Sequence, residues 1–333
     1  MQAENQAETR GKASLWPHRR APWWIKAGAQ AALSLLPFGE ALNYRLQIWN
    51  GFCSNFDRDI DRNIQHLCAL VRTTTRLGLQ LQDANILEVG TGWIPTLPIG
   101  MYLLGAKQVH TYDHVRHLRT ANLARLLGLY SKHLPVLAEA AHSEVAPLEA
   151  KLSGLKARQG ESLDQWLNPG GIHYYAPGDA SQTGLADKSL DLCFSVAVLG
   201  HVSVPGIKAM LHEAYRTLRA GGLTYHAIGL FDQYTHVDPN ITRVNFLKYS
   251  DFTWRILGQN RIQFQNRLRQ SEFLLLFREA GFEIVDLRSE VDQRSLEALE
   301  TMRLNPQFNR FDKKDLATTG TFITARKPIP SQT

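Results

Sequence analysis

The chain has 333 residues, which is enough for one large domain or two ordinary ones. A hydrophobic content of 44% and a charged content of 20% are typical of a soluble globular protein, and no stretch approaches the length of an apolar membrane span. The net charge of +6 does not by itself argue for nucleic acid, and three widely spaced cysteines argue against a zinc site or a disulfide framework. The composition favours a cytoplasmic protein.

The first part of the chain predicts a tail followed by helices. Residues 1–22 are polar and are expected to be disordered, whereas residues 23–82 are expected to form a helical extension or lid. Within the extension, Ile60–Leu79 is a long amphipathic stretch, and Ala27–Phe38 is an apolar run that polar residues interrupt. We interpret this run as a helix that packs on the protein or covers a cleft. A helix resting on a membrane surface and a targeting segment are the alternatives.

An α/β pattern occupies residues 83–333. Strand-like apolar runs alternate with helical patterns, as expected for a doubly wound sheet. These runs are Ile86–Val89, Gln108–Asp113, Ile172–Tyr175, Leu190–Val196, Leu223–Gly229, Glu283–Leu287 and Thr319–Ala325. Residues 114–171 and 231–282 are too long for simple crossovers, so we expect helical insertions there, with one or two helices in the first. The second insertion starts at the carboxyl end of a strand, where open α/β sheets bind ligands.

A glycine turn follows the first of these strands. Gly90 and Gly92 allow the backbone to bend sharply and to approach a ligand where a Cβ would collide. The next strand ends at Asp113, and an acid at that place in a βαβ unit can bind both hydroxyls of a ribose. A further carboxylate, Asp179, follows the third strand beside Ala180, although a capped Pro-Gly turn explains it equally simply. These features indicate a nucleotide-like cofactor.

Together, these segments resemble the class I S-adenosylmethionine-dependent methyltransferases over about residues 84–230. In that family a strand ending Glu-x-Gly-x-Gly wraps the methionine part of the cofactor, an acid after the second strand binds the ribose, and a Gly-Asp-Ala segment meets the adenine. The resemblance extends to the fourth strand and to a helix that we expect to end at Gly221-Gly222. It implies that the cofactor is bound by Glu88, Gly90, Gly92, Asp113, Asp179, Ala180 and Ser195.

The sequence differs at one position from the nicotinamide-binding domains, which are the main alternative, and at another from the methyltransferases. A nicotinamide-binding domain requires a third glycine where Pro95 stands, and no tyrosine has a lysine four residues later, so hydride transfer is disfavoured. The methyltransferase turn usually continues with a small residue where this chain has Trp93. Trp93 is either a wall of the methionine pocket or a sign of a drifted site.

The resemblance implies an α/β fold with a Rossmann-like, doubly wound sheet of seven strands, the last one antiparallel. It implies transfer of a methyl group from S-adenosyl-L-methionine to a hydroxyl or other nucleophile of a small-molecule, glycan or lipid-linked acceptor, which leaves S-adenosyl-L-homocysteine. No metal is expected. A catalytically inactive cofactor-binding partner subunit and an RNA methyltransferase are the alternatives, and the second is weakened because no separate RNA-binding domain is visible.

A cluster of histidines and acids lies at the end of the fifth strand. Methylation of a hydroxyl is helped by a base with a pKa near neutrality. We prefer His236 as this base, oriented by Asp232 or Asp238, and keep His226, which lies within the strand, as the alternative. A purely structural role explains either histidine about as well.

Basic residues are concentrated in residues 241–270, where six stand against one acid. Aromatic residues in the same stretch make it suitable for sugar rings, phosphates or lipid head groups. The stretch is either an ordinary solvated helix face or a surface for an anionic acceptor or an anionic membrane. In the second case the protein would be peripheral to a membrane.

Overall fold

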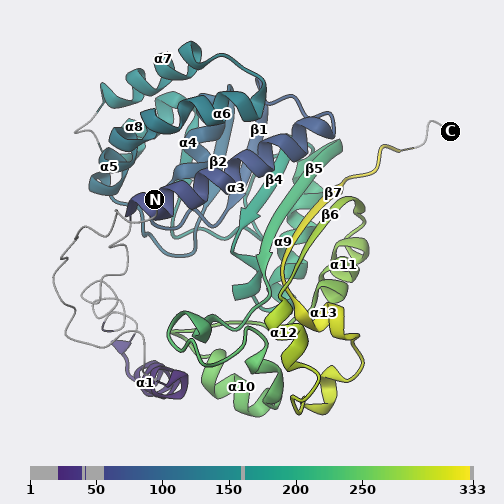
Figure 1. Ribbon diagram of the computed structural model, residues 1–333. Coiled ribbons are helices and arrows are strands. Elements are labelled where there is room, and N and C mark those ends of the chain that lie inside the picture. Colours follow the sequence, from purple (N-terminus) through teal and green to yellow (C-terminus); the bar gives the residue numbers. More distant parts are fainter. Residues whose placement is uncertain (1–21, 40–41, 43–55, 159–161, 331–333) are drawn as a thin grey trace, which may run out of the picture.

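The computed structural model describes residues 22–39, 42, 56–158 and 162–330 (Figure 1). The expected tail therefore lies outside the described residues, apart from Pro22. A seven-stranded sheet forms the centre of the molecule, with the strand order β3-β2-β1-β4-β5-β7-β6. Its strands are β1 (Asn85–Val89), β2 (Gln108–Tyr112), β3 (Ile172–Tyr175), β4 (Leu190–Val196), β5 (Leu218–Gly229), β6 (Glu283–Val291) and β7 (Thr318–Arg326).

The register of the sheet confirms the predicted fold class. β1 pairs in parallel with β2 and β4, β2 with β3, and β4 with β5. β7 lies between β5 and β6 and is antiparallel to both. This is the Rossmann-like doubly wound arrangement with an antiparallel last strand.

Helices cover both faces of the sheet. On one face lie α3 (Phe56–Arg76), α4 (Thr96–Leu103), α5 (Thr120–Tyr130), α6 (Leu134–Ala141), α7 (Val145–Lys156) and α8 (Leu163–Leu167), and the other face is covered by α9 (Val204–Thr217) and α11 (Gln270–Glu279) (Figure 1). Successive side chains of a strand point to opposite faces. Accordingly Ile86 joins the hydrophobic core on the α3 side, whereas Leu87 joins the core on the α9 side.

A third hydrophobic cluster lies below the sheet in Figure 1. It combines α1 (Trp23–Ser34) with α10 (Asp251–Gly258), α12 (Gln293–Ala298) and α13 (Lys313–Ala317). The 3₁₀ turns of the described chain are Ser131–His133, Asn168–Gly170, Leu199–His201, Gln233–His236, Asn245–Lys248 and Pro306–Phe308. The extension expected over residues 23–82 thus supplies two different layers, because α1 packs in this cluster and α3 packs on the sheet.

Two local expectations were wrong. The first insertion contains four α-helices, α5 to α8, instead of one or two. The helix before β5 ends at Thr217 and not at Gly221-Gly222, which lie inside β5. Leu218 already pairs with Leu190 of β4, and the register then shifts before Leu223 pairs with Leu192, so the glycines occupy an irregular part of the strand.

Candidate cofactor and active site

A cavity of about 810 Å³ opens at the carboxyl ends of β1, β4 and β5. The glycine turn after β1 forms one wall, and the ends of β4 and β5 form a second. α3 and strands β6 and β7 complete it. This position is the one in which open α/β sheets bind ligands.

The two glycines of the turn have different physical roles. Both adopt the left-handed backbone region, with φ of 88° at Gly90 and 66° at Gly92. A Cβ on Gly90 would lie 2.3 Å from Cγ2 of Val198, so close packing requires glycine there. A Cβ on Gly92 would meet no atom within 4 Å, although Gly92 lines the cavity. The turn therefore leaves an open space beside Gly92 that a ligand can approach.

Glu88 is a buried carboxyl group on the wall of this cavity, with 3% of its surface exposed. It accepts a hydrogen bond from Oγ1 of Thr111, which lies 2.5 Å from Oγ1 of Thr91. Burial, against the effect of the Thr111 hydrogen bond and with a smaller contribution from the nearby Asp113, raises the pKa of Glu88 to about 8. A bound cation would favour the ionised form of this group.

Asp113 is held against the glycine turn. Its Oδ2 accepts a hydrogen bond from the Gly92 backbone N–H at 2.8 Å, and its Oδ1 accepts one from the Val115 N–H at 3.2 Å. Burial raises the pKa of Asp113, but hydrogen bonds from His114 and from these two N–H groups outweigh burial and hold the pKa below 3.8. Asp113 is therefore a carboxylate at neutral pH.

These groups fit S-adenosylmethionine. The cofactor carries a sulfonium and an ammonium, and the buried Glu88 carboxyl with its raised pKa lacks a cationic partner among the described residues. The open approach at Gly92 suits the close contact that the glycine turn predicts. Asp113 lies next to that turn, where a ribose would be bound.

Trp93 lines the cavity and stacks on His117, with ring centroids 4.6 Å apart and an angle of 23° between the rings. It also packs against the main core. Of the two explanations for this bulky residue, the geometry favours a pocket wall.

Asp179 and Ala180 lie in the loop after β3 and do not line the cavity. Asp179 is exposed and accepts a hydrogen bond from the Ser181 N–H at 2.8 Å, whereas Ala180 is buried in the core. The loop nevertheless lies close to the site, because the Gly178 N–H donates to the carbonyl of Asp113 at 2.8 Å. Their contact with adenine stays a prediction.

The structure contradicts the expectations for the side chains of Ser195 and His226. The Ser195 hydroxyl lies 2.7 Å from Nδ1 of His226, and Nε2 of the same ring lies 2.7 Å from Oγ1 of Thr224. Both are buried, and burial lowers the pKa of His226 to about 3. Their strand neighbours Val196 and Ala227 line the cavity instead, because successive side chains alternate between the faces of the sheet. His226 is a core histidine, and the Ser195 side chain points away from the cavity.

His236 is the catalytic candidate that does line the cavity. Its ring meets Phe231 edge to face, with centroids 5.5 Å apart. Burial and the positive charges of Lys26, Arg243 and Arg62 lower the pKa of His236 below 6.5. The imidazole is therefore neutral at pH 7 and can accept a proton.

The carboxylates expected to orient His236 bind other groups. Asp232 accepts hydrogen bonds from the Tyr234 N–H at 2.9 Å and the Asn245 amide at 3.3 Å, and burial raises its pKa to about 6. Asp238 accepts one from the Trp23 N–H at 3.1 Å. Within the described residues neither carboxylate is hydrogen-bonded to His236. Both hold the loop after β5 in place, and their role in orienting His236 stays a prediction.

The sequence did not indicate the contribution of α3 to the cavity. Arg58, Arg62 and His66 follow one another at intervals of four, which places them on one face of the helix, and all three line the cavity. Arg243 faces them from the loop after β5. This spacing was visible in the sequence, but nothing in it indicated which face of the helix meets the site.

The basic stretch is only partly a surface. Arg269 is fully buried, and its guanidinium donates to the carbonyl of Leu230 at 3.1 Å. The side chain of Arg267 is 5% exposed and donates to the carbonyl of Phe246 at 2.9 Å and to Asp251. Two of the six cations therefore stabilise the insertion instead of facing solvent.

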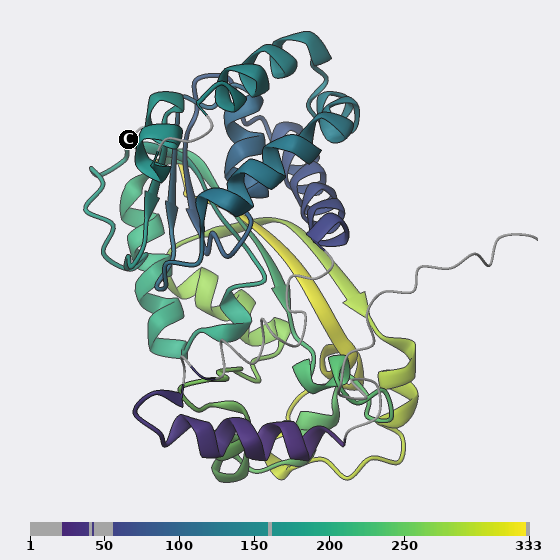
Figure 2. The ribbon, with the colours of Figure 1, turned by 90° about the vertical axis from the view of Figure 1, so that its left-hand side faces the viewer.

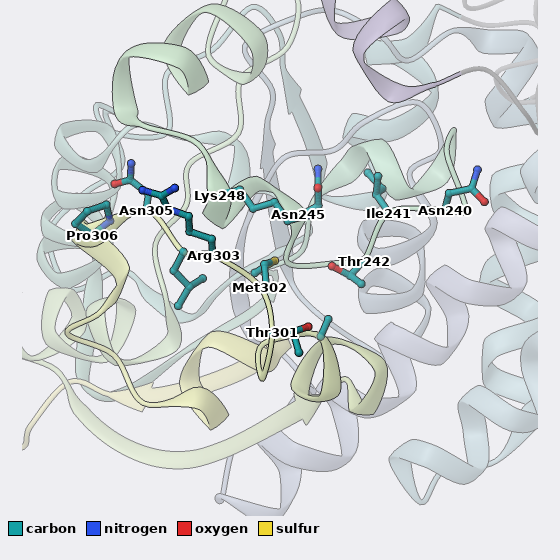
Figure 3. Close-up of a pocket in the computed structure, with 12 residues that line it drawn as sticks. Asn240, Ile241, Thr242, Asn245, Lys248, Thr301, Met302, Arg303, Asn305 and Pro306 are labelled. Carbon is teal, nitrogen blue, oxygen red and sulfur yellow. The ribbon is translucent and has the colours of Figure 1, made fainter.

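A second, shallow cavity of about 830 Å³ lies between the loop after β5 and the loop after α12 (Figure 3). Thr242 and Lys248 line it from the first loop, and Arg303 lines it from the second. The neighbouring Arg243 lines the cofactor cavity, so this loop separates the two cavities.

No curated protein matches the sequence at a significant level. Similar solved structures include an S-adenosylmethionine-dependent methyltransferase from Methanosarcina mazei, with 19% identity, a TM-score of 0.42, and coverage of 75% of this chain and 95% of the other. Another is a phosphoethanolamine N-methyltransferase from Haemonchus contortus in complex with S-adenosylmethionine, with 15% identity, a TM-score of 0.39, and coverage of 77% and 51%. Scores this low carry no conclusion about substrate.

In the part of the chain that the structure describes, no helix has the length and apolar character needed to cross a membrane.

A family model described as a methyltransferase domain matches residues 129–226, a range that includes β3, β4 and most of β5. The strand order and the antiparallel β7 are those expected from the resemblance to class I enzymes. The fold is therefore that of the class I S-adenosylmethionine-dependent methyltransferases.

Proposed function

We propose that this protein transfers a methyl group from S-adenosylmethionine to a hydroxyl group of an anionic small-molecule, glycan or lipid-linked acceptor. The observation that carries the proposal is the position of His236, a histidine that is neutral at pH 7 and lines the same cavity as the glycine turn. S-adenosylmethionine supplies a methyl group on a positively charged sulfur, which is a good leaving group.

Each wall of the cavity has a part in this proposal. Glu88 and the turn at Gly90 and Gly92 bind the methionine portion of the cofactor, and Asp113 binds its ribose. His236 accepts the proton of the acceptor hydroxyl while the new carbon–oxygen bond forms and the carbon–sulfur bond breaks. Positioning of the acceptor and the cofactor in one cavity supplies the remaining acceleration.

Three arginines support an anionic acceptor. Arg58, Arg62 and Arg243 line the cavity, together with the acidic residues Asp59 and Glu290. Arg62 forms an ion pair with Asp59 at 3.0 Å, and Arg243 lies over the ring of Phe231. Guanidinium groups are well suited to phosphate and carboxylate, so a sugar phosphate, an acidic sugar or a phosphate-linked lipid fits this end.

A His236→Gln variant tests the proposal. S-adenosylmethionine labelled in its methyl group would be incubated with sugar phosphates, uronic acids and polyprenyl-phosphate-linked glycans, and labelled product would be counted. We expect His236→Gln to keep cofactor binding in calorimetry and to lose about 10²-fold or more in turnover. His212→Gln, an exposed histidine on α9, is the matched control and should keep full activity.

The outcomes separate the alternatives. If the protein binds the cofactor but methylates none of these acceptors, the inactive partner subunit becomes the better explanation. Full turnover by His236→Gln would exclude the histidine as the base. A protein that binds neither S-adenosylmethionine nor S-adenosylhomocysteine would contradict the proposal as a whole.

A further inference from the structure

The outer face of α1 is unusually apolar for a helix that faces water. Its inner face, with Trp23, Ala27 and Gln30, is buried in the third hydrophobic cluster. The outward positions of the helix and of the turn after it carry no polar side chain. They are Trp24, Ile25, Gly28, Ala29, Ala32, Leu35 and Leu36, and all seven are exposed. A helix that only covers the protein would present polar residues on this side.

α10 adds to this face. It packs against α1, and the two helices lie together at the bottom of Figures 1 and 2. Trp254 of α10 is fully buried, whereas Phe252 and Ile256 point away from the cluster and are 73% and 49% exposed. We call the exposed apolar side chains of both segments the α1–α10 surface; they are Trp24, Ile25, Leu35, Leu36, Phe38, Phe252 and Ile256.

The extent of exposure indicates that this surface has a partner. Trp24, Leu35 and Phe38 are 59%, 85% and 79% exposed, and together with Phe252 they are among the most exposed large apolar side chains of the described residues. Single exposed hydrophobic residues are common on proteins, but several exposed aromatic and branched side chains on two helices that pack together indicate a binding surface.

The charges beside the surface identify the kind of partner. Arg255 is exposed on α10, next to Phe252 and Ile256. α1 contains no acidic residue, and Asp251, the acid of α10, forms an ion pair with Arg267 at 2.5 Å. Tryptophan, phenylalanine and leucine next to unneutralised cations are the composition of helices that lie in the interface of an anionic bilayer.

We propose that the α1–α10 surface docks the protein on an anionic lipid bilayer, with the apolar side chains in the interface and with Arg255 at the head groups. Trp23 of α1 packs on Tyr234 and donates its N–H to Asp238, on either side of His236, so α1 lies near the rim of the cofactor cavity. Docking would bring that rim close to the membrane. The inference goes beyond methyl transfer and does not depend on it, because it concerns a surface outside the cavity.

Sedimentation with lipid vesicles tests the inference. Full-length protein would be mixed with vesicles of phosphatidylglycerol and phosphatidylcholine, or of phosphatidylcholine alone. We expect binding to the anionic vesicles that Trp24→Gln/Phe252→Gln weakens at least about tenfold, since each buried large side chain contributes 1.5–3 kcal/mol or roughly a factor of ten or more. The matched control is Leu275→Gln/Ile329→Gln, which changes two apolar residues with similar exposure elsewhere, 54% and 69%, and should bind as the wild type.

A second pair of variants tests the charges. Arg255→Gln should weaken binding to the anionic vesicles about fivefold, and Arg278→Gln, exposed on α11, should not. Every variant should bind S-adenosylmethionine as the wild type does, which shows that it is folded and separates this test from the test of the proposed function.

Three results would overturn the inference. The first is no binding to vesicles by wild-type protein that binds the cofactor. The second is an equal loss of binding in the patch variant and its control. The third is a dimer in light scattering that Trp24→Gln/Phe252→Gln converts to a monomer, because a second copy of the chain would then be the partner.

Discussion

The two glycines of the cofactor turn should respond differently to the same substitution. An alanine at either position is held in the left-handed backbone region, which costs about 1–2 kcal/mol of folding free energy. At Gly90 the new Cβ also lies 2.3 Å from Cγ2 of Val198, and relieving such overpacking costs about 1–3 kcal/mol more. Gly90→Ala should therefore destabilise the protein by about 2–5 kcal/mol, and Gly92→Ala by about 1–2 kcal/mol.

Urea denaturation of the two variants measures this difference. Calorimetry with S-adenosylmethionine should show a different effect of Gly92→Ala. Its new methyl group projects into open space on the cavity wall, so this variant should lose more affinity for the cofactor than stability. In a Val198→Ala background, which removes the contacting methyl, Gly90→Ala should cost little more than Gly92→Ala costs in the wild type. Equal destabilisation by the two alanines in the wild type would refute the reasoning, and so would an unchanged cost of Gly90→Ala in the Val198→Ala background.

Two further predictions concern Glu88 and Arg267. Because the pKa of Glu88 is raised to about 8, affinity for the cationic cofactor should increase as the pH rises through 8, and calorimetry should show that Glu88→Gln removes this dependence. The same raised pKa means that the free energy of unfolding falls as the pH rises from the unfolded value near 4.5 through 8, and Glu88→Gln should flatten that fall in urea titrations. Arg267→Ala removes the guanidinium donor from the carbonyls of Phe246 and Tyr249 and should cost about 2–4 kcal/mol in the same measurement, whereas Arg255→Ala, on the exposed side of α10, should cost under about 0.5 kcal/mol. A loss at Arg267 as small as that at Arg255 would contradict the structural role assigned to it.

The strands and the glycine turn could be predicted because their signals are local. Runs such as Leu190–Val196 are short, apolar and bounded by turn residues, and the structure begins and ends β4 at the same residues. The turn at Gly90 and Gly92 needs positive φ, a requirement that glycine itself reveals.

Side-chain direction in the central strands could not be predicted from the sequence. Helices cover both faces of the sheet, so β5 carries apolar side chains on both of its faces. The sequence pattern therefore does not show whether His226 or Ala227 faces the cavity. Two expected site residues, His226 and Ser195, were lost for this reason. Arg269 was expected at the surface but is buried. Its guanidinium donates to the carbonyl of Leu230, which is 39 residues away in the sequence, so the local pattern could not show the burial.

The position of β7 has a consequence for how the protein is made. β7 is synthesised after every other strand, yet it lies between β5 and β6 and supplies Thr319, Gly320 and Phe322 to the cavity. β6 therefore has no neighbour in the sheet until β7 is inserted. While the ribosome is still extending the chain, the glycine turn and α3 can fold, but the cofactor cavity lacks one wall. The complete cavity thus forms only once β7 has been added, and a nascent chain that stops before β7 would expose the edge of β5 instead.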